Sequence, residues 1–308
     1  MSYPSGKDMA NWMGGLPESL HSSSLNSIAI PGTHDSFSWG LDVTGDIGPD
    51  NLPFVKTLVQ LFPGTAKAII AKWSKTQSLN TVEQLKAGIR YFDIRVTLKK
   101  DTQELHAVHG LYGRKMEMEL QDISQFLDNH SKEIVLLDFN HFYSMDEENH
   151  IQCISLIQHI FGPKLCPLLD TDSVTLDMLW ENGLQVLVFY HHDIVTNHLN
   201  LWPGCTIPSP WPDTMDINKF ITFLEQNYRH GRSPCAFYVT QGILTPDSST
   251  VVTNLCGDLR NAVAKRVCGP LHQWLCTKRC GLTTVNVVIS DFVEMDNFIG
   301  TVVDMNYK

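Results

Sequence analysis

The sequence predicts an α/β fold, a TIM-type (β/α) barrel that is irregular or distorted and forms a single domain. Seven short apolar runs of β-type residues recur along nearly the whole chain, and segments with helical spacing lie between most of them. Strands that alternate with helices favour parallel pairing. With 308 residues, of which 43% are hydrophobic, the chain can bury one large core.

Each expected strand ends at polar or titratable residues. We expect the strands at residues 27–33, 88–96, 104–108, 133–139, 184–189, 236–240 and 284–290. We expect helices at residues 81–87, 118–129, 149–161, 217–228 and 255–274. The segments that follow the strands of a barrel share one mouth, so polar residues far apart in the sequence should meet there.

The barrel should account for most of the chain. Residues 1–26 are expected to form an N-terminal extension packed on the barrel, and residues 27–308 form the barrel itself. No linker, charge block or internal repeat divides the sequence. We interpret the proline-rich stretch at residues 202–214 as a long barrel loop.

Composition limits the partners and the location that we expect. The net charge of −10 argues against nucleic acid and against simple electrostatic adhesion to anionic membranes. The start of the chain lacks a signal-peptide pattern, and no run approaches the roughly 18 uninterrupted apolar residues of a transmembrane helix. We therefore expect a cytoplasmic protein without a transmembrane segment. Because no address motif is evident, a nuclear pool is also compatible with the sequence.

The eight cysteines are expected to be free thiols. Cys276 and Cys280, with Cys268 nearby, invite a zinc interpretation. Their spacing matches no standard paired knuckle, so we favour ordinary thiols.

The strand at residues 88–96 carries the most informative pair of side chains. Asp93 and Arg95 are two residues apart, which places them on the same face of an extended strand. An Arg at a strand end can stabilise charge on a transferring phosphoryl group, and an Asp beside it can hold the guanidinium in place. Taken alone, the pair could equally be a structural ion pair that satisfies itself.

Four motifs in combination resemble a known family. IPGT at residues 30–33 leads to His34 and Asp35, TQ at 76–77 precedes QL at 84–85, and GIRYFDIR at 88–95 precedes VHG at 108–110. Together they resemble the catalytic X region of phosphatidylinositol-specific phospholipases C. LDFNHFY at residues 137–143 and the stretch 236–246 are similar to the small eukaryotic X-domain-containing proteins of that family. The resemblance covers about the whole chain, and no pleckstrin-homology, EF-hand, Y or C2 segment is visible.

The resemblance implies a hydrolase that cleaves phosphatidylinositol-type lipids, with roles in lipid degradation and signal transduction. Such a cleavage needs a base for the inositol 2-hydroxyl, an acid for the departing glycerol oxygen and a cation for the phosphoryl oxygens. By similarity His34 is the base and His109 the acid, and the products are diacylglycerol and inositol 1,2-cyclic phosphate. We expect Asp291 to pair with His34 and Asp35 to pair with His109.

Arg95 also affects whether the site is expected to bind a metal ion. In calcium-dependent members of the family, acidic metal ligands stand at the strand end where this chain has Arg95. The resemblance therefore implies the metal-free arrangement of the bacterial members. We therefore expect no metal and no other cofactor. The alternative is a metal-dependent phosphodiesterase on the same barrel, with His34, Asp35, Asp93 and His109 as ligands.

Further residues at strand ends are expected to line the substrate pocket. These substrate-binding candidates are Asp93, Asn140, His141, Tyr190 and Gln241. The bacterial relatives present a Lys and an Arg where this chain has Asn140-His141 and Tyr190-His191, so the pocket should hold phosphate less tightly. Lys115 is a possible substitute. A second hypothesis is therefore a catalytically weak adaptor that binds inositol lipids.

The substrate lies in a bilayer, so peripheral contact with a membrane surface is expected. Phe54, Val55 and Leu58 recur at helical spacing and could insert from an interfacial helix. The alternative is a helix whose apolar face packs on the barrel. Trp39 and Trp211 lie on expected loops, and an indole suits the headgroup region.

Overall fold

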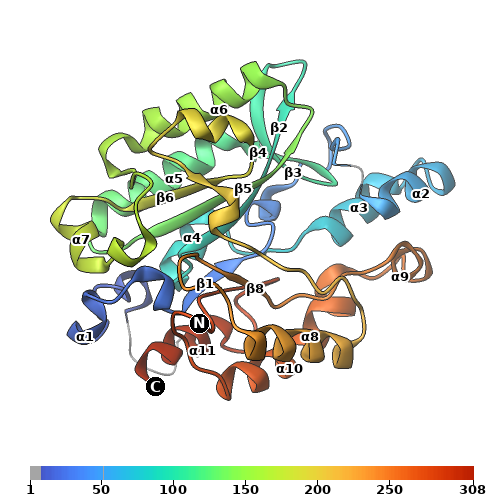
Figure 1. The fold of residues 1–308 in the computed structure, drawn as a ribbon. Helices are drawn as coiled ribbons and strands as arrows, with labels where there is room; N and C mark the ends of the chain where they lie inside the picture. Colours follow the sequence, from blue (N-terminus) through green and yellow to red (C-terminus); the bar gives the residue numbers. More distant parts are fainter. Residues whose placement is uncertain (1–7, 51) are drawn as a thin grey trace.

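The computed structural model defines residues 8–50 and 52–308, and its centre is a curled, mostly parallel sheet (Figure 1). The strands lie in the order β7-β6-β5-β2-β1-β9-β8. Their bounds are β1 Ile30–Thr33, β2 Tyr91–Lys99, β5 Val135–Tyr143, β6 Val186–Tyr190, β7 Trp202–Pro203, β8 Val239–Gln241 and β9 Val287–Ser290. Neighbouring strands along this path are all parallel, as the alternating pattern predicts.

The barrel closes irregularly between β7 and β8. These two strands do not pair, but Phe237 N donates to Thr206 O at 2.9 Å and Val239 N donates to Pro208 O at 3.0 Å. The proline-rich stretch that we expected to be a loop therefore begins as a short strand and continues beside β8. Proline cannot donate to a ladder, which explains why β7 is only two residues long.

Helices surround the sheet (Figure 1). Their bounds are α1 Glu18–His21, α2 Pro53–Leu61, α3 Ala66–Ser74, α4 Thr81–Ala87, α5 Met116–Asn129, α6 Glu147–Phe161, α7 Leu176–Glu181, α8 Ile217–His230, α9 Ser248–Thr253, α10 Lys265–Cys276 and α11 Phe298–Asp304. The helix expected at residues 255–274 starts later, because residues 260–264 form a π-helical turn before α10. No helix of the described chain has the length and apolar character needed to cross a bilayer.

One expected strand is not part of the parallel barrel. Residues 104–109 form β3 (Glu104–His109), which pairs antiparallel with β2, and β4 (Leu111–Lys115) pairs with β3. The prediction of parallel pairing is wrong here because tight connections join β2, β3 and β4, and such connections produce antiparallel neighbours. The hairpin still brings His109 to the mouth.

A buried ion pair ties the start of the chain to the barrel. Arg90 and Glu133 are both fully buried, with Nη2 and Oε2 2.7 Å apart. Glu133 accepts bonds from the backbone N–H groups of Met13 and Gly14, and Arg90 donates to the carbonyl of Ala10. Residues 8–16 are thereby held against the amino ends of the central strands.

We predict that Glu133→Ala lowers the free energy of unfolding by about 3–5 kcal/mol, because it leaves the Arg90 charge buried without a partner. The matched control is Glu104→Ala, which breaks the more exposed Lys115–Glu104 pair and should lower the free energy of unfolding far less. Urea denaturation of both variants tests this. Equal losses would show that the buried pair does not anchor the start of the chain.

Candidate active site

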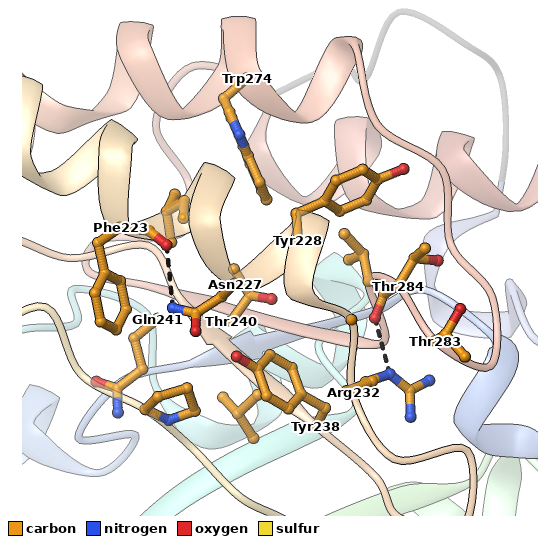
Figure 2. Close-up of a pocket in the computed structure, with 15 residues that line it drawn as sticks. Phe223, Asn227, Tyr228, Arg232, Tyr238, Thr240, Gln241, Trp274, Thr283 and Thr284 are labelled. Carbon is orange, nitrogen blue, oxygen red and sulfur yellow. Dashed lines mark hydrogen bonds between the residues drawn. The ribbon is translucent and has the colours of Figure 1, made fainter.

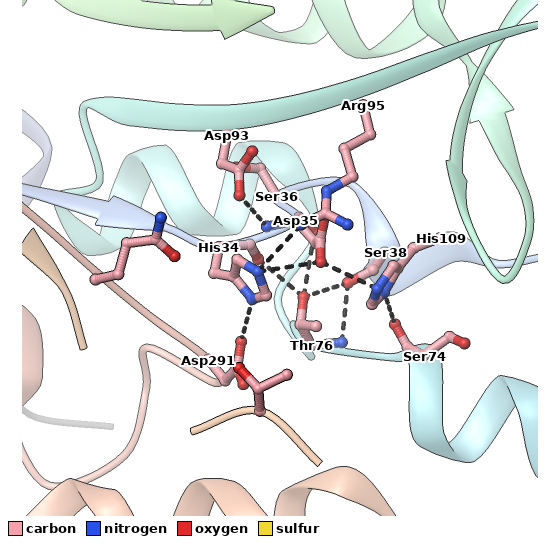
Figure 3. Close-up of polar contacts among 12 residues, drawn as sticks. His34, Asp35, Ser36, Ser38, Ser74, Thr76, Asp93, Arg95, His109 and Asp291 are labelled. Carbon is pink, nitrogen blue, oxygen red and sulfur yellow. Dashed lines mark hydrogen bonds and ion pairs between the residues drawn. The ribbon is translucent and has the colours of Figure 1, made fainter. Parts of the chain in front are cut away.

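The site is built around the carboxylate of Asp35 (Figure 3). Asp35 follows β1 and has φ 42°, a left-handed conformation that Asp tolerates better than most residues. Its side chain is only 2% exposed. Arg95 Nε contacts Oδ1, while His109 Nε2 and His34 Nε2 lie 3.2 Å and 3.3 Å from Oδ2. Burial acts to raise the pKa of Asp35, but the charges of Arg95, His109 and His34 outweigh it and lower that pKa to about 2.

His34 lies between two carboxylates. Its Nδ1 is 2.8 Å from Asp291 Oδ1, and its Nε2 faces Asp35 and lies 3.4 Å from Arg95 Nη2. Burial acts to lower the pKa of His34, but the charges of Asp35 and Asp291 raise it to about 9. Because a carboxylate only accepts, Nδ1 carries the hydrogen and Nε2 is the atom that faces the pocket.

His109 reaches the site from the end of β3. Its Nδ1 lies 2.6 Å from Ser74 O, and because a carbonyl only accepts, Nδ1 is the donor and Nε2 faces Asp35. Gly110 has φ 70°, and a Cβ there would lie 2.3 Å from Ser74 Oγ. The tight turn after His109 therefore requires glycine.

The structure brings together all five residues that we predicted as catalytic: His34, Asp35, Arg95, His109 and Asp291. The ring centroids of His34 and His109 are 6.5 Å apart. Both pairings that we expected, Asp291 with His34 and Asp35 with His109, are present as contacts. Asp35 also contacts His34, so one carboxylate serves both imidazoles.

The partner of Arg95 differs from the expected one. We predicted that Asp93 holds the guanidinium, but the ion pair forms with Asp35. Asp93 Oδ2 instead accepts the backbone N–H of Asp35, and its Oδ1 accepts from Asn140 Nδ2 at 2.7 Å. The register between β2 and β5 shifts here, because Asn140 of β5 has no partner in β2 between Phe139 and His141.

The predicted substrate-binding residues separate into two groups. Asp93, Asn140 and His141 lie beside the site, and His141 Nδ1 is 2.8 Å from Asn140 Oδ1.

The prediction is wrong for Tyr190, which is fully buried in the core with its hydroxyl 2.8 Å from His150 Nδ1. It is also wrong for Gln241, whose amide donates to Ser209 in a separate hollow between α8, α10, β8 and residues 283–285 (Figure 2).

His191, which sequence reasoning places at the rim of the pocket, has a buried partner at the end of β6 that the sequence did not indicate. His191 Nε2 lies 2.7 Å from Oδ1 of the fully buried Asp138. Burial acts to lower the pKa of His191, but the bond to Asp138 raises it. Lys115, the substitute cation that we considered, is instead paired with Glu104 at 2.6 Å.

The predicted membrane contacts are mostly wrong. Phe54, Val55 and Leu58 are buried, because this face of α2 packs against the rest of the protein. The guanidinium of Arg114 lies 5.0 Å from the centre of a Trp39 ring, so that ring is engaged within the protein. Trp211 is 50% exposed and stays a prediction.

The site has groups that could attract a metal ion. His34, Asp35 and Asp93 offer ligand atoms that all lie within 4.8 Å of one another. Arg95 already contacts Asp35, and both oxygens of Asp93 accept hydrogen bonds from Asp35 N and Asn140. A divalent cation would meet the guanidinium charge directly, so this donor set suits a metal poorly.

Comparisons with known proteins indicate one family. The model of the family "Phosphatidylinositol-specific phospholipase C, X domain" matches residues 68–192. PI-PLC X domain-containing protein 3 of Homo sapiens is 42% identical over 301 residues, which are 97% of this chain and 94% of that protein. PI-PLC X domain-containing protein 2 of Mus musculus is 44% identical over 299 residues, which are 96% of this chain and 87% of that protein.

A solved structure supports the fold. The phosphatidylinositol-specific phospholipase C from Listeria monocytogenes superimposes with a TM-score of 0.69 at 19% sequence identity, covering 97% of this chain and 99% of that one. At this identity the likeness concerns the barrel fold alone. Taken with the similarity to the mammalian relatives, the chain belongs to the phosphatidylinositol-specific phospholipase C X-domain family.

Proposed function

We propose that this protein is a metal-independent phospholipase C that cleaves phosphatidylinositol-type lipids at a membrane surface. The observation that carries the proposal is the arrangement of His34, His109 and Arg95 around one buried carboxylate. Two groups that can transfer protons lie close to a permanent cation, which is what phosphodiester cleavage through a cyclic intermediate requires. The family and the barrel fold support the same reaction class.

In the proposed first step, His34 Nε2 takes the proton of the inositol 2-hydroxyl as that oxygen attacks phosphorus. His109 Nε2 donates its proton to the glycerol oxygen as the phosphorus–oxygen bond breaks. Asp291 holds the His34 hydrogen on Nδ1, and Ser74 O does the same for His109. The products are diacylglycerol and inositol 1,2-cyclic phosphate, which water then opens slowly with the two roles reversed.

Arg95 stabilises the charge on the phosphoryl oxygens. Burial acts to lower the pKa of Arg95, but the charge of Asp35 raises it above its ordinary value, so the guanidinium stays charged. The ion pair uses Nε, which fixes the plane of the guanidinium. Its remaining N–H groups can then face the phosphate.

A catalytically weak adaptor is the second candidate, and the scarcity of cations favours it. Lys115 is engaged by Glu104. With a pKa of about 9 for His34, only about 1% of molecules hold this residue neutral at pH 7. An adaptor would bind inositol lipids without releasing inositol phosphate.

Chelation tests the metal-free proposal. We expect purified protein to cleave phosphatidylinositol in mixed vesicles with excess chelator, and phosphorus NMR should detect the five-membered cyclic phosphate before any open-chain product. Activity that is lost on chelation and restored by calcium would establish the metal-dependent alternative. Vesicle binding without any release of inositol phosphate would establish the adaptor.

We predict that Arg95→Lys lowers kcat/KM at least about 100-fold, because lysine keeps the charge but loses the planar fork. The matched control is Arg229→Lys, since the Arg229 side chain is 77% exposed on α8 and should tolerate the change. Circular dichroism verifies that both variants fold. Near-normal turnover in Arg95→Lys would place the phosphate site elsewhere.

The pH dependence should report the state of His34. If neutral His34 is the base and protonated His109 is the acid, the pH profile of kcat/KM has one limb near pH 9 that reports the titration of His34. Asp35→Asn removes one of the carboxylate charges that raise the pKa of His34, so this limb should move to lower pH while the maximal rate falls. Asn also tolerates the left-handed backbone of this position. A limb at the same pH in both proteins would contradict the assignment.

A further inference from the structure

The hydrogen-bond ladder between β1 and β9 stops at the active site. His34 N donates to Ser290 O at 3.2 Å, and in a parallel ladder the next bond would run from Phe292 N to His34 O. Phe292 N instead donates to Thr76 O at 2.7 Å, and Phe292 has φ 47°. The two strands therefore part at the point where His34 and Asp291 must meet.

Gln77 occupies the gap between the strand ends. Its Nε2 donates to His34 O and to Ser290 O, each at 2.9 Å, so the two amide hydrogens join β1 to β9. Gln77 is fully buried, where an amide has no water to replace these bonds. Thr76 Oγ1 adds a third donor, which reaches His34 O at 2.8 Å.

Both neighbours of Asp291 are fixed by the same segment, residues 74–77. Gln77 holds the carbonyl of Ser290, and the Thr76 carbonyl holds the N–H of Phe292. The carbonyl oxygen of His34 accepts hydrogen bonds from the side chains of both Thr76 and Gln77. The contact of 2.8 Å between His34 Nδ1 and Asp291 Oδ1 therefore depends on this segment.

We propose that Gln77 is a positioning residue that sets the His34–Asp291 hydrogen bond by joining the ends of β1 and β9 where their ladder stops. Its effect on turnover rests on the proposed phospholipase function, whereas its effect on His34 does not. Gln77 has its own backbone partners and acts on the reaction only through His34 and Asp291.

The chain offers a matched control at the opposite end of the sheet. Gln185 is also buried, and its Nε2 donates to the carbonyls of His130 and Glu133, each at 3.0 Å. Gln77→Met and Gln185→Met remove the same chemical group and the same type of bond. Both variants should lose stability, but only Gln77→Met should affect His34.

The test follows the titration of His34 by NMR and the kinetics of both variants. In Gln77→Met we expect the midpoint of His34 to fall by about one pH unit, because a longer contact with Asp291 favours the imidazolium less. We expect kcat to fall at least about 10-fold with little change in KM, because the substrate contacts remain. Gln185→Met should leave the midpoint, kcat and KM unchanged.

An unchanged midpoint in Gln77→Met, or equal shifts in both variants, would overturn the proposal. If Gln77→Met does not fold, Gln77→Asn carries the test, because it keeps the amide but is one methylene shorter and cannot reach both carbonyls as Gln77 does. The midpoint of His34 should then fall by a smaller amount, and no shift would overturn the proposal. Wild-type protein without turnover would defeat the phospholipase proposal, while the titration would still test Gln77.

Discussion

The buried carboxylate of Asp35 is the interaction on which the rest of the site depends. A carboxylate loses several kcal/mol of hydration when it is buried, and only close cations and donors can offset that loss. His34 supplies such a partner from just after β1, Arg95 from within β2 and His109 from the end of β3. Any change in one of the three alters the charge that the other two experience. The reacting groups are therefore coupled through one anion and do not act as independent residues.

The irregular features of the barrel coincide with this site. The register shift at Ile94/Arg95, the left-handed backbone of Asp35 and that of Phe292 all lie within the same few strand ends. A regular parallel ladder would direct these side chains away from one another and would leave no place for Gln77. The left-handed backbone conformations of Asp35 and Phe292 persist because buried hydrogen bonds restrain the backbone around them. The distortion of the barrel is thus part of how the site is assembled.

The sequence predicted the barrel from its alternating strands and helices, and it predicted the five central residues because polar motifs that follow the strands resemble those of a known family. It did not predict the antiparallel β3, since an apolar run gives no strand direction. Tyr190 and Gln241 were wrong because the position after a strand does not fix which way a side chain points. Phe54 was wrong because the apolar face of a helix suits a core as well as a bilayer. Thr76 and Gln77 appeared only as part of a family motif, and the sequence did not predict their role. Their side chains bind carbonyl groups that are distant in the sequence, and such contacts produce no periodic pattern.

The shared oxygen of Asp35 has a consequence for the proposed reaction. His34 Nε2 and His109 Nε2, the two atoms that would transfer protons, both lie close to Oδ2 of this one carboxylate. The proposed first step needs a neutral His34 as base and a protonated His109 as acid. The first step then leaves His34 protonated and His109 neutral. That is the arrangement required for His109 to activate water and for His34 to return the proton to the inositol oxygen, so the second step starts without exchange of protons with solvent.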